Sequence, residues 1–363
     1  MTHDRKPLLV DIRIPYCIRE EPFQKKLQLV GSNAEKNAYM AALKRELLSW
    51  EGELDSYEVQ ALRLSGGNAT VMSPDLLGEL LKTAREILPL AHSAELSVDA
   101  QPLTIGTPAL TGIAAGRPNR MELMMRSGSD EELRALGCPH TMQDVQNAIL
   151  FFNRFHMNNL GLTVDLGIPG QSEQSWHNTL RACTIFRPAH IHVEMPEVRD
   201  AEGMPDEETR FAWYRYACDF LAENDYHRYE AGSFCLPQHA CRYTLAELEG
   251  TALLGLGLGA FSLLDGYLTR NTNRLPTYLS FAGDYEKTTA EVFSAEGDFL
   301  MRNYASSRLR APEGLSHAGF LDRFDGSIPD VLRAELAGRL EQGLLEETPD
   351  GYVPTERGLF AVL

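Results

Sequence analysis

The chain has 363 residues, enough for one large α/β domain with a smaller appendage, and 44% of them are hydrophobic, as in ordinary globular proteins. Its formal net charge of −17 argues against nucleic-acid binding and against an anionic membrane surface. The six cysteines are scattered without a Cys-x2-Cys pair, which excludes a zinc ribbon or a disulfide framework.

Neither a membrane span nor a signal segment is expected. Every apolar run falls short of the ~20 residues that cross a bilayer, and the first residues lead straight into a predicted strand. The sequence therefore predicts a cytoplasmic protein in a reducing compartment, without an integral membrane segment, whose acidic surface aids solubility.

Alternating strands and helices are predicted over the first 225 residues. In the first strand Ile12 and Ile14 alternate with Asp11 and Arg13, and Pro15 ends it. Apolar runs predict further strands at 59–64, 96–100, 120–125, 160–166 and 190–194. Helical spacing predicts helices at 33–50, 74–87, 102–115, 130–136, 142–156, 174–186 and 207–224. This alternation implies βαβ units and a parallel sheet, so the expected fold is α/β, an incomplete (β/α)6 TIM-like barrel.

The rest of the chain is expected to form two further regions after the barrel of residues 1–225. These are an extension, 226–296, and a small C-terminal domain, 297–363. In the latter, helices are predicted at 319–324 and 328–341, and Asp350-Gly351 is a turn signal that indicates a β-wing. The arrangement is winged-helix-like. Its second helix is not basic, so the domain is expected to pack against the barrel rather than to bind DNA.

The loop after the first strand presents one cysteine at the carboxyl end of that strand. In an α/β fold this end faces the ligand crevice. The sequence Ile14-Pro15-Tyr16-Cys17 resembles the opening of radical S-adenosylmethionine proteins, in the branch of the HemW heme chaperones and HemN oxygen-independent coproporphyrinogen III oxidases. The resemblance covers nearly the whole chain and implies the same incomplete barrel.

The family holds three irons of a four-iron four-sulfur cluster with a Cys-x3-Cys-x2-Cys triplet, and S-adenosylmethionine holds the fourth iron. Here the first position is Cys17, and the second and third are Glu21 and Gln24. Iron–sulfur clusters are held chiefly by Cys thiolates. We therefore expect Cys17 to be a vestigial cluster position kept by packing, and the cluster and its chemistry to be lost.

Further motifs along the barrel imply a degraded S-adenosylmethionine site. The family's glycine-rich second loop and later motifs are matched only in part. The resemblance implies cofactor contacts from Gly66, Gly67, Asp99, Arg120 and Gln171. Other ligand positions depart from the pattern, namely Asp11, Met124 and Arg126.

The glycine-rich run 255–260 matches the family closely. By itself it could suggest a dinucleotide site. However, we predict no strand before the run, and no acidic partner follows at the expected spacing, so this kind of site is rejected.

The segment from His239 to Tyr243 matches a heme-associated motif, His-Asn-x-x-Tyr, of the heme-chaperone branch. This chain keeps His239 and Tyr243 and replaces the Asn with Ala240. Imidazole and phenolate are both axial ligands of heme iron, so the resemblance implies His239 as a heme ligand. The alternative is local hydrogen bonding of both side chains in a surface loop. His190 and His192 are expected at the barrel mouth as satisfied polar groups.

Three functions remain open from the sequence. The first is a non-catalytic protein that binds or chaperones heme or a related tetrapyrrole, and loss of two cluster cysteines favours it. The second is an active radical S-adenosylmethionine enzyme of the coproporphyrinogen dehydrogenase type, whose cluster is completed by unusual ligands or by a partner chain. The third is a regulatory or scaffold subunit whose acidic surface meets a basic partner protein.

Overall fold

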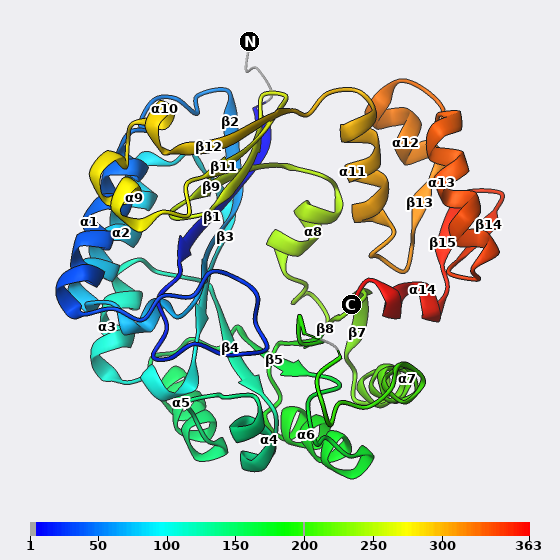
Figure 1. The fold of residues 1–363 in the computed structure, drawn as a ribbon, viewed down its shortest axis with the longest axis horizontal. Helices are drawn as coiled ribbons and strands as arrows, with labels where there is room; N and C mark the ends of the chain where they lie inside the picture. The colour runs from blue at the N-terminus through cyan, green and yellow to red at the C-terminus, as the bar shows by residue number, and fades with distance from the viewer. Residues whose placement is uncertain (1–4, 199) are drawn as a thin grey trace.

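A twelve-stranded sheet wound into an open barrel organises the computed structural model, which describes residues 5–198 and 200–363 (Figure 1). The strand order is β12-β11-β10-β9-β1-β2-β3-β4-β5-β6-β8-β7. The parallel strands are β1 (Lys6–Ile14), β2 (Tyr57–Gly66), β3 (Leu90–Ala100), β4 (Arg120–Arg126), β5 (Leu160–Asp165), β6 (His190–Glu194) and β9 (Ala252–Leu256). Antiparallel strands lie at both edges: β7 (His227–Glu230), β8 (Ser233–Cys235), β10 (Phe261–Leu264), β11 (Tyr267–Asn271) and β12 (Thr289–Ser294). The expected α/β fold with an incomplete barrel is confirmed.

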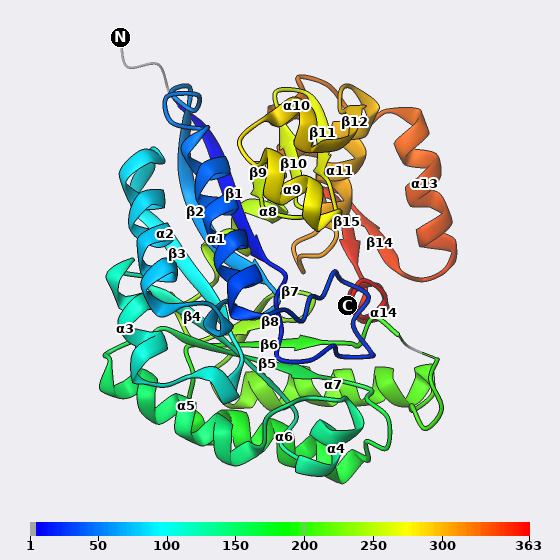
Figure 2. The ribbon, with the colours of Figure 1, turned by 60° about the vertical axis from the view of Figure 1, so that its left-hand side comes forward.

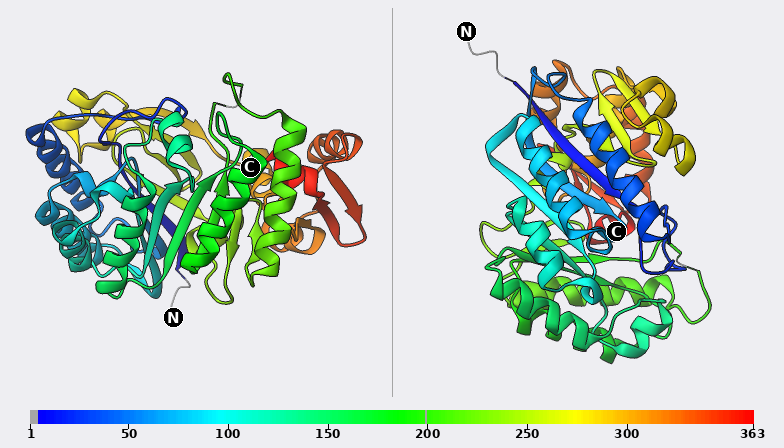
Figure 3. Two further views of the ribbon diagram at one scale, coloured as in Figure 1. Left: turned by 90° about the horizontal axis from the view of Figure 1, so that it is seen from below. Right: turned by 90° about the vertical axis from the view of Figure 1, so that its left-hand side faces the viewer.

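Helices α1 to α7 cover the outer face of the parallel strands (Figures 2 and 3). They are α1 (Asn33–Leu48), α2 (Pro74–Ile87), α3 (Thr107–Ala115), α4 (Asp130–Ala135), α5 (Met142–Arg154), α6 (Glu173–Phe186) and α7 (Glu207–Glu223). Helix α2 shows why the sequence predicts them well. Pro74 occupies its first turn, where the missing N–H costs nothing, and Leu77, Leu80 and Leu81 face the sheet at helical spacing.

The inner face of the barrel is polar. In β1, Leu8, Val10 and Ile12 pack outward into the main hydrophobic core, so Asp11 and Arg13 point inward. Branched aliphatic side chains usually fill the interior of a closed barrel. Here the interior is instead available for charged groups, and the candidate site lies there.

A strand leads directly into the glycine-rich run, so the expectation that no strand precedes it is wrong. Strand β9 pairs with β1 in the centre of the sheet. Pattern analysis missed β9 because its residues do not alternate between polar and apolar, and because Gly255 interrupts its short apolar run. A Cβ at Gly255 would lie 2.0 Å from the Phe261 carbonyl oxygen, and Gly257 has φ +105° beside the Arg13 carbonyl. Glycine is therefore needed at these positions because neighbouring backbone approaches too closely for a side chain.

The C-terminal segment has the helix–helix–hairpin order that the sequence predicts. It comprises α11 (Asp298–Arg308), β13 (Leu315–Ser316), α12 (His317–Phe324), α13 (Asp330–Glu341), β14 (Leu345–Thr348), β15 (Gly351–Pro354) and α14 (Glu356–Ala361). A separate apolar cluster lies beneath these helices. The segment also packs on the barrel, since Phe360 of α14 stacks against Phe211 and Tyr214 of α7 and Glu356 pairs with Arg228.

The extension contributes strands β7 to β12 to the barrel sheet together with α8 (Arg242–Leu248), α9 (Leu275–Phe281) and α10 (Tyr285–Thr288). These short antiparallel strands and helices were not predicted from periodicity. The division at residues 226 and 297 stays a prediction. Within residues 5–198 and 200–363, every helix is too short or too polar to cross a bilayer.

Candidate functional site

The loop that follows β1 folds across the carboxyl end of the barrel and is held there by its backbone. Cys17 N donates to the Leu29 carbonyl at 2.9 Å, and Leu29 N donates to the Pro15 carbonyl at 2.8 Å. The loop after β2 packs directly against it. A Cβ at Gly67 would lie 2.5 Å from the Tyr16 carbonyl oxygen and 2.9 Å from Cys17 Sγ. The absence of a side chain at Gly67 therefore allows the two loops to pack in direct contact, with no space between them.

The thiol of Cys17 is buried and protonated. Its side chain is 3% exposed, and burial, reinforced by the nearby Glu21 carboxylate, raises its pKa to about 11. A cluster ligand must be a thiolate. This environment disfavours the ligating form.

We expect Cys17 to react very slowly with iodoacetamide at pH 7.5, at least about 100-fold more slowly than in the denatured chain, because only the thiolate attacks. Peptide mass spectrometry of native and denatured samples measures this. The other five thiols of the denatured chain act as internal controls. Rapid labelling of native Cys17 would instead indicate an exposed, activated thiolate of the kind a cluster requires.

Glu21 and Gln24, at the other two cluster positions, form side-chain hydrogen bonds to the rest of the barrel. Glu21 Oε1 accepts from Gln101 Nε2 at 3.0 Å. In the amide orientation that satisfies both groups, the Gln24 oxygen accepts from the two terminal nitrogens of Arg126 at 2.6 and 2.9 Å. Both side chains therefore have partners within the chain.

Arg126 occupies the centre of this network. It ends β4 at a register shift against β5, with φ +66°, a left-handed conformation that is uncommon outside glycine. Its guanidinium contacts Asp165 Oδ2 at 2.7 Å and Glu194 Oε1 at 2.5 Å, and its side chain is 5% exposed. Burial holds the pKa of Asp165 well above its ordinary value despite Arg126. Burial also acts to raise the pKa of Glu194, but Arg126 together with His192, Lys26 and Arg63 outweighs it and lowers that pKa.

We define the crevice as the space lined by Cys17, Glu21, Gln24, Gly67, Met124 and Arg126. It encloses a cavity of about 10 Å³, which is the room of about one water molecule. Lys26, Gln28, Gln101 and His140 also line it, so one thiol, one carboxylate, one imidazole and three amides surround it. Within the described residues no set of three or more His, Cys, Asp or Glu side chains is arranged to hold a metal ion. These residues do not fit a four-iron cluster held by three thiolates.

The predicted S-adenosylmethionine positions at this end of the barrel are also engaged within the chain. Asp99 forms an ion pair with Arg63, with Nη2 at 2.8 Å from the carboxylate. Gln171 accepts from Gly167 N at 2.7 Å and donates to the Asp165 carbonyl at 3.2 Å, closing the turn after β5. Gly66, with φ +105°, lies against the backbone of Ile14.

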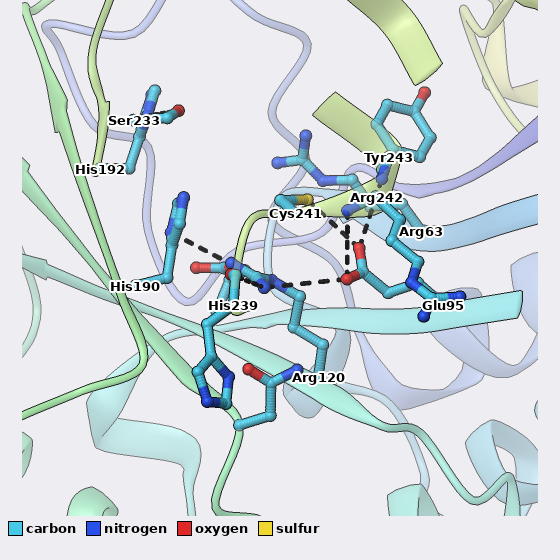
Figure 4. Close-up of polar contacts among 12 residues, drawn as sticks. Arg63, Glu95, Arg120, His190, His192, Ser233, His239, Cys241, Arg242 and Tyr243 are labelled. Atoms are coloured by element: carbon cyan, nitrogen blue, oxygen red, sulfur yellow. Dashed lines mark hydrogen bonds and ion pairs between the residues drawn. The ribbon is translucent and has the colours of Figure 1, made fainter. Parts of the chain in front are cut away.

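Arg120 lies at the opposite end, because it is the first residue of β4. It is fully buried, and its guanidinium bonds to Glu122 at 2.5 Å, to the His239 carbonyl at 3.1 Å and pairs with Glu95 at 3.7 Å (Figure 4). The structure thus separates Arg120 from the crevice and corrects its expected role. Arg120 stabilises what we call the floor, the amino-terminal end of the barrel closed by residues 236–243.

Glu95 holds the floor segment from the other side. Its carboxylate accepts from the Cys241 thiol at 3.2 Å and from the backbone nitrogens of Arg242 and Tyr243 at 3.3 and 3.4 Å. These bonds fix the start of α8, which rises beside β2 into the barrel (Figure 1). Residues 239–243 are therefore part of the barrel floor.

The structure does not bring His239 and Tyr243 together. The His239 ring is exposed and points away from Tyr243, as Figure 4 shows. Tyr243 is 6% exposed and packs with Leu9 and Ala61, and burial raises its pKa well above the ordinary value. His239 remains accessible to a ligand at the surface of the floor, and Tyr243 is a core residue.

Between the floor and the crevice lies the lumen, a polar cavity of about 230 Å³. One ring nitrogen of His190 bonds the Tyr229 hydroxyl at 2.9 Å, and one of His192 bonds the Ser233 hydroxyl at 3.0 Å. The buried Nδ1 of His190 lies 3.8 Å from Glu122, beyond hydrogen-bond distance, so the expectation of satisfied polar groups is met only in part. Burial lowers the pKa of His190. Pockets for drug-sized ligands measure about 300–1,000 Å³, so a tetrapyrrole exceeds this lumen.

Comparison with known proteins agrees with the fold over nearly the whole chain. The heme chaperone HemW of Escherichia coli K12 is 24% identical over 97% of this chain and 95% of its own length, and that of Lactococcus lactis is 22% identical over 98% and 95%. The anaerobic coproporphyrinogen III oxidase 1 of Cereibacter sphaeroides is 24% identical over 75% and 66%. The solved structure of HemN from Escherichia coli superimposes with a TM-score of 0.84 at 19% identity, covering 99% of this chain and 88% of that one.

The chain is a relative of HemW and HemN. No family model matches it. Its barrel has the fold of HemN, the coproporphyrinogen III oxidase of Escherichia coli, which is a radical SAM enzyme.

In this HemW/HemN relative, pattern analysis missed the residues that fill the barrel. Arg126 was noted only as a departure from the family, and the lumen residues Arg63, Glu122 and Arg310 were not singled out. The signal was present in part, because Glu122 and Met124 share one face of a predicted strand. The partners of Arg126 come from β5 and β6, and pattern analysis does not reveal such distant contacts.

Proposed function

We propose that this HemW/HemN relative is a cytoplasmic, non-catalytic protein that binds heme or a related tetrapyrrole without an iron–sulfur cluster. The filled crevice argues against catalysis, because Arg126 and its acidic partners occupy the space beside a single buried thiol. The relatives named heme chaperones supply the ligand class.

The observation that carries tetrapyrrole binding is a groove on the floor side of the barrel. It has a volume of about 700 Å³ and is lined by Tyr229, Arg242, Leu245, Leu248 and Arg308, among others. The groove is large enough for a tetrapyrrole, whereas the lumen is too small. The exposed Leu245 would contact the apolar ring. Arg242 and Arg308 are bonded to the Ser93 carbonyl and to Glu249, and they would exchange these partners for the carboxylates of the ligand.

His239 lies three residues before Arg242 and is exposed, outside the lining of the groove itself. Its imidazole would supply an axial ligand to heme iron, a role that neutral histidine performs widely. Tyr243 would take no part, because its ring is buried in the core beneath the floor.

Heme titration followed by absorption in the Soret region tests this proposal. We expect the wild-type protein to shift the Soret band, His239→Ala to weaken binding about ten-fold or more, and Arg242→Ala to weaken it by a smaller factor. His156→Ala, which removes another exposed histidine, is the matched control and should bind like the wild type. Absence of any Soret shift in the wild type would contradict tetrapyrrole binding.

The second candidate is an active radical S-adenosylmethionine enzyme, favoured by the similarity to coproporphyrinogen III oxidases. In that case Gly66, Gly67, Asp99 and Gln171 would contact the nucleotide, and Cys17 would ligate iron with help from a partner protein. Anaerobic reconstitution with iron and sulfide distinguishes the two. About four irons per chain with charge-transfer absorption would favour the enzyme, and iron-free protein favours the tetrapyrrole-binding protein.

A further inference from the structure

A cavity of about 300 Å³ lies outside the barrel, between the end of α1 and the outer face of β9 to β11. Its size is at the lower end of the range for small-molecule sites. The residues that line it include Glu46, Trp50, Glu53, Asn271 and Tyr285. This cavity and the crevice lie on opposite faces of the sheet, because the cavity faces the helical layer and the crevice faces the lumen.

Two aromatic rings form a corner of this cavity. The centroids of Trp50 and Tyr285 are 6.5 Å apart, and their planes meet at 87°. Trp50 is half-buried and Tyr285 is 52% exposed, so ring surface remains available to a ligand. Ring faces attract cations, and alkylated ammonium groups are the ligands for which aromatic walls are best suited.

The charges around the cavity have one sign. Glu46 and Glu53 both line it, and its described lining contains no lysine or arginine. Glu46 accepts from Tyr278 at 2.5 Å, Asn271 at 2.6 Å and Gly257 N at 2.8 Å, which fixes its position at the back of the cavity. Burial raises the pKa of this carboxyl, so Glu53 is the main charged group of the lining. Glu53 is exposed at the rim.

Helix α1 adds a further negative potential. It runs for 16 residues and ends at Leu48, immediately before the lining residues Ser49 and Trp50. The carboxyl end of a helix carries a partial negative charge that favours cations. Two basic side chains next to the lining residues in sequence have other partners: Arg45 donates to the Leu279 carbonyl at 2.7 Å, and Lys287 pairs with Asp284 at 2.6 Å.

We propose that this cavity is a binding site for a small organic cation with an alkylated ammonium group. The aromatic corner contacts the alkyl groups, the Glu53 carboxylate pairs with the charge at the rim, and the carboxyl end of α1 supplies negative potential at the back. The site is independent of the floor groove and does not rest on tetrapyrrole binding.

Isothermal titration calorimetry with choline tests the proposal, and 3,3-dimethyl-1-butanol is the neutral control ligand of the same shape. We expect choline to bind in the millimolar range or tighter, and the neutral alcohol to bind at least about ten-fold more weakly, because only the charge differs. Phosphatidylcholine vesicles presented in a flotation assay distinguish a free cation from a lipid headgroup. Equal binding of choline and the alcohol, or binding of neither, would overturn the proposal.

Two variants locate the site. Tyr285→Leu should weaken choline binding about two- to thirty-fold, and Glu53→Gln should weaken it by a smaller factor. Both residues are exposed, so the fold is preserved, and circular dichroism melting checks this. Glu51→Gln alters a neighbouring exposed carboxylate outside the lining and should bind like the wild type. Choline binding that both site variants leave unchanged would place the cation elsewhere and overturn the assignment.

Discussion

Replacing Arg126 with methionine is expected to lower the free energy of unfolding by about 3–5 kcal/mol at neutral pH. Methionine keeps most of the volume but removes the guanidinium that bonds Asp165 and Glu194 and the Gln24 amide. Removing one partner of a buried ion pair leaves charges that have lost their water and gained no compensation. Urea unfolding followed by circular dichroism measures the change.

Arg154→Met is the matched control, because Arg154 is exposed on α5 and its described contact is with the face of the Phe151 ring. It should change stability by no more than about 0.5 kcal/mol. If Arg126→Met cost as little as this control, the network would be a surface-like pair without structural importance.

The loss of unfolding free energy caused by Arg126→Met should become smaller as the pH is lowered. Burial already raises the pKa of Asp165 above its unfolded value, and losing Arg126 raises it further. A carboxyl whose folded pKa is raised binds its proton more tightly in the folded state, so folding gains stability as pH falls through that pKa. We therefore expect a smaller difference from wild type at pH 5 than at pH 8. A constant difference would mean that the carboxylates do not respond to the lost guanidinium.

Restoring the cluster cysteines alone is expected to fail. The double variant Glu21→Cys with Gln24→Cys supplies three thiols, yet Arg126 still fills the crevice, whose cavity is about 10 Å³. After anaerobic reconstitution we expect far fewer than the four irons of a complete cluster per chain. Adding Arg126→Gly should raise the iron and sulfide content toward about four each, because it removes the guanidinium and suits the left-handed backbone at this position.

Arg126→Gly by itself is the control for this experiment, since it opens the crevice without supplying thiols and should remain iron-free. Full reconstitution of the double variant would show that Arg126 is no obstacle to a cluster. An iron-free triple variant would show that the Cys17 loop itself has lost the geometry that a cluster needs.

Local patterns predicted the framework of the barrel well, because each of its central strands and outer helices obeys one rule of spacing. The strand 190–194 and the helix 74–87 have the bounds expected from sequence. Strand β9 was missed because it is buried between neighbours and interrupted by Gly255, so it shows neither alternation nor length. The short antiparallel strands at the edges are set by pairing with distant strands rather than by their own periodicity.

The site was predicted less well, for a reason that Arg120 illustrates. Motif matching assigned Arg120 to the cofactor, although it begins a predicted strand and therefore had to lie at the end away from the crevice. His239 and Tyr243 were paired because they match a motif of the heme-chaperone branch, but the bonds from Glu95 turn the segment so that one ring faces solvent and the other the core. The role of Arg126 could not be predicted from sequence because its partners lie on two other strands.

The pairing of β1 with β9 has a consequence for synthesis on the ribosome. Leu8 lies beside Ala252, about 240 residues later in the chain. At about 5–20 residues per second, one edge of β1 stays without its neighbour for roughly 10–50 seconds after it emerges. That edge belongs to an apolar strand, and open apolar edges recruit other chains. The open edge therefore persists until β9 has emerged, and the rate of translation across residues 60–250 sets how long that exposure lasts.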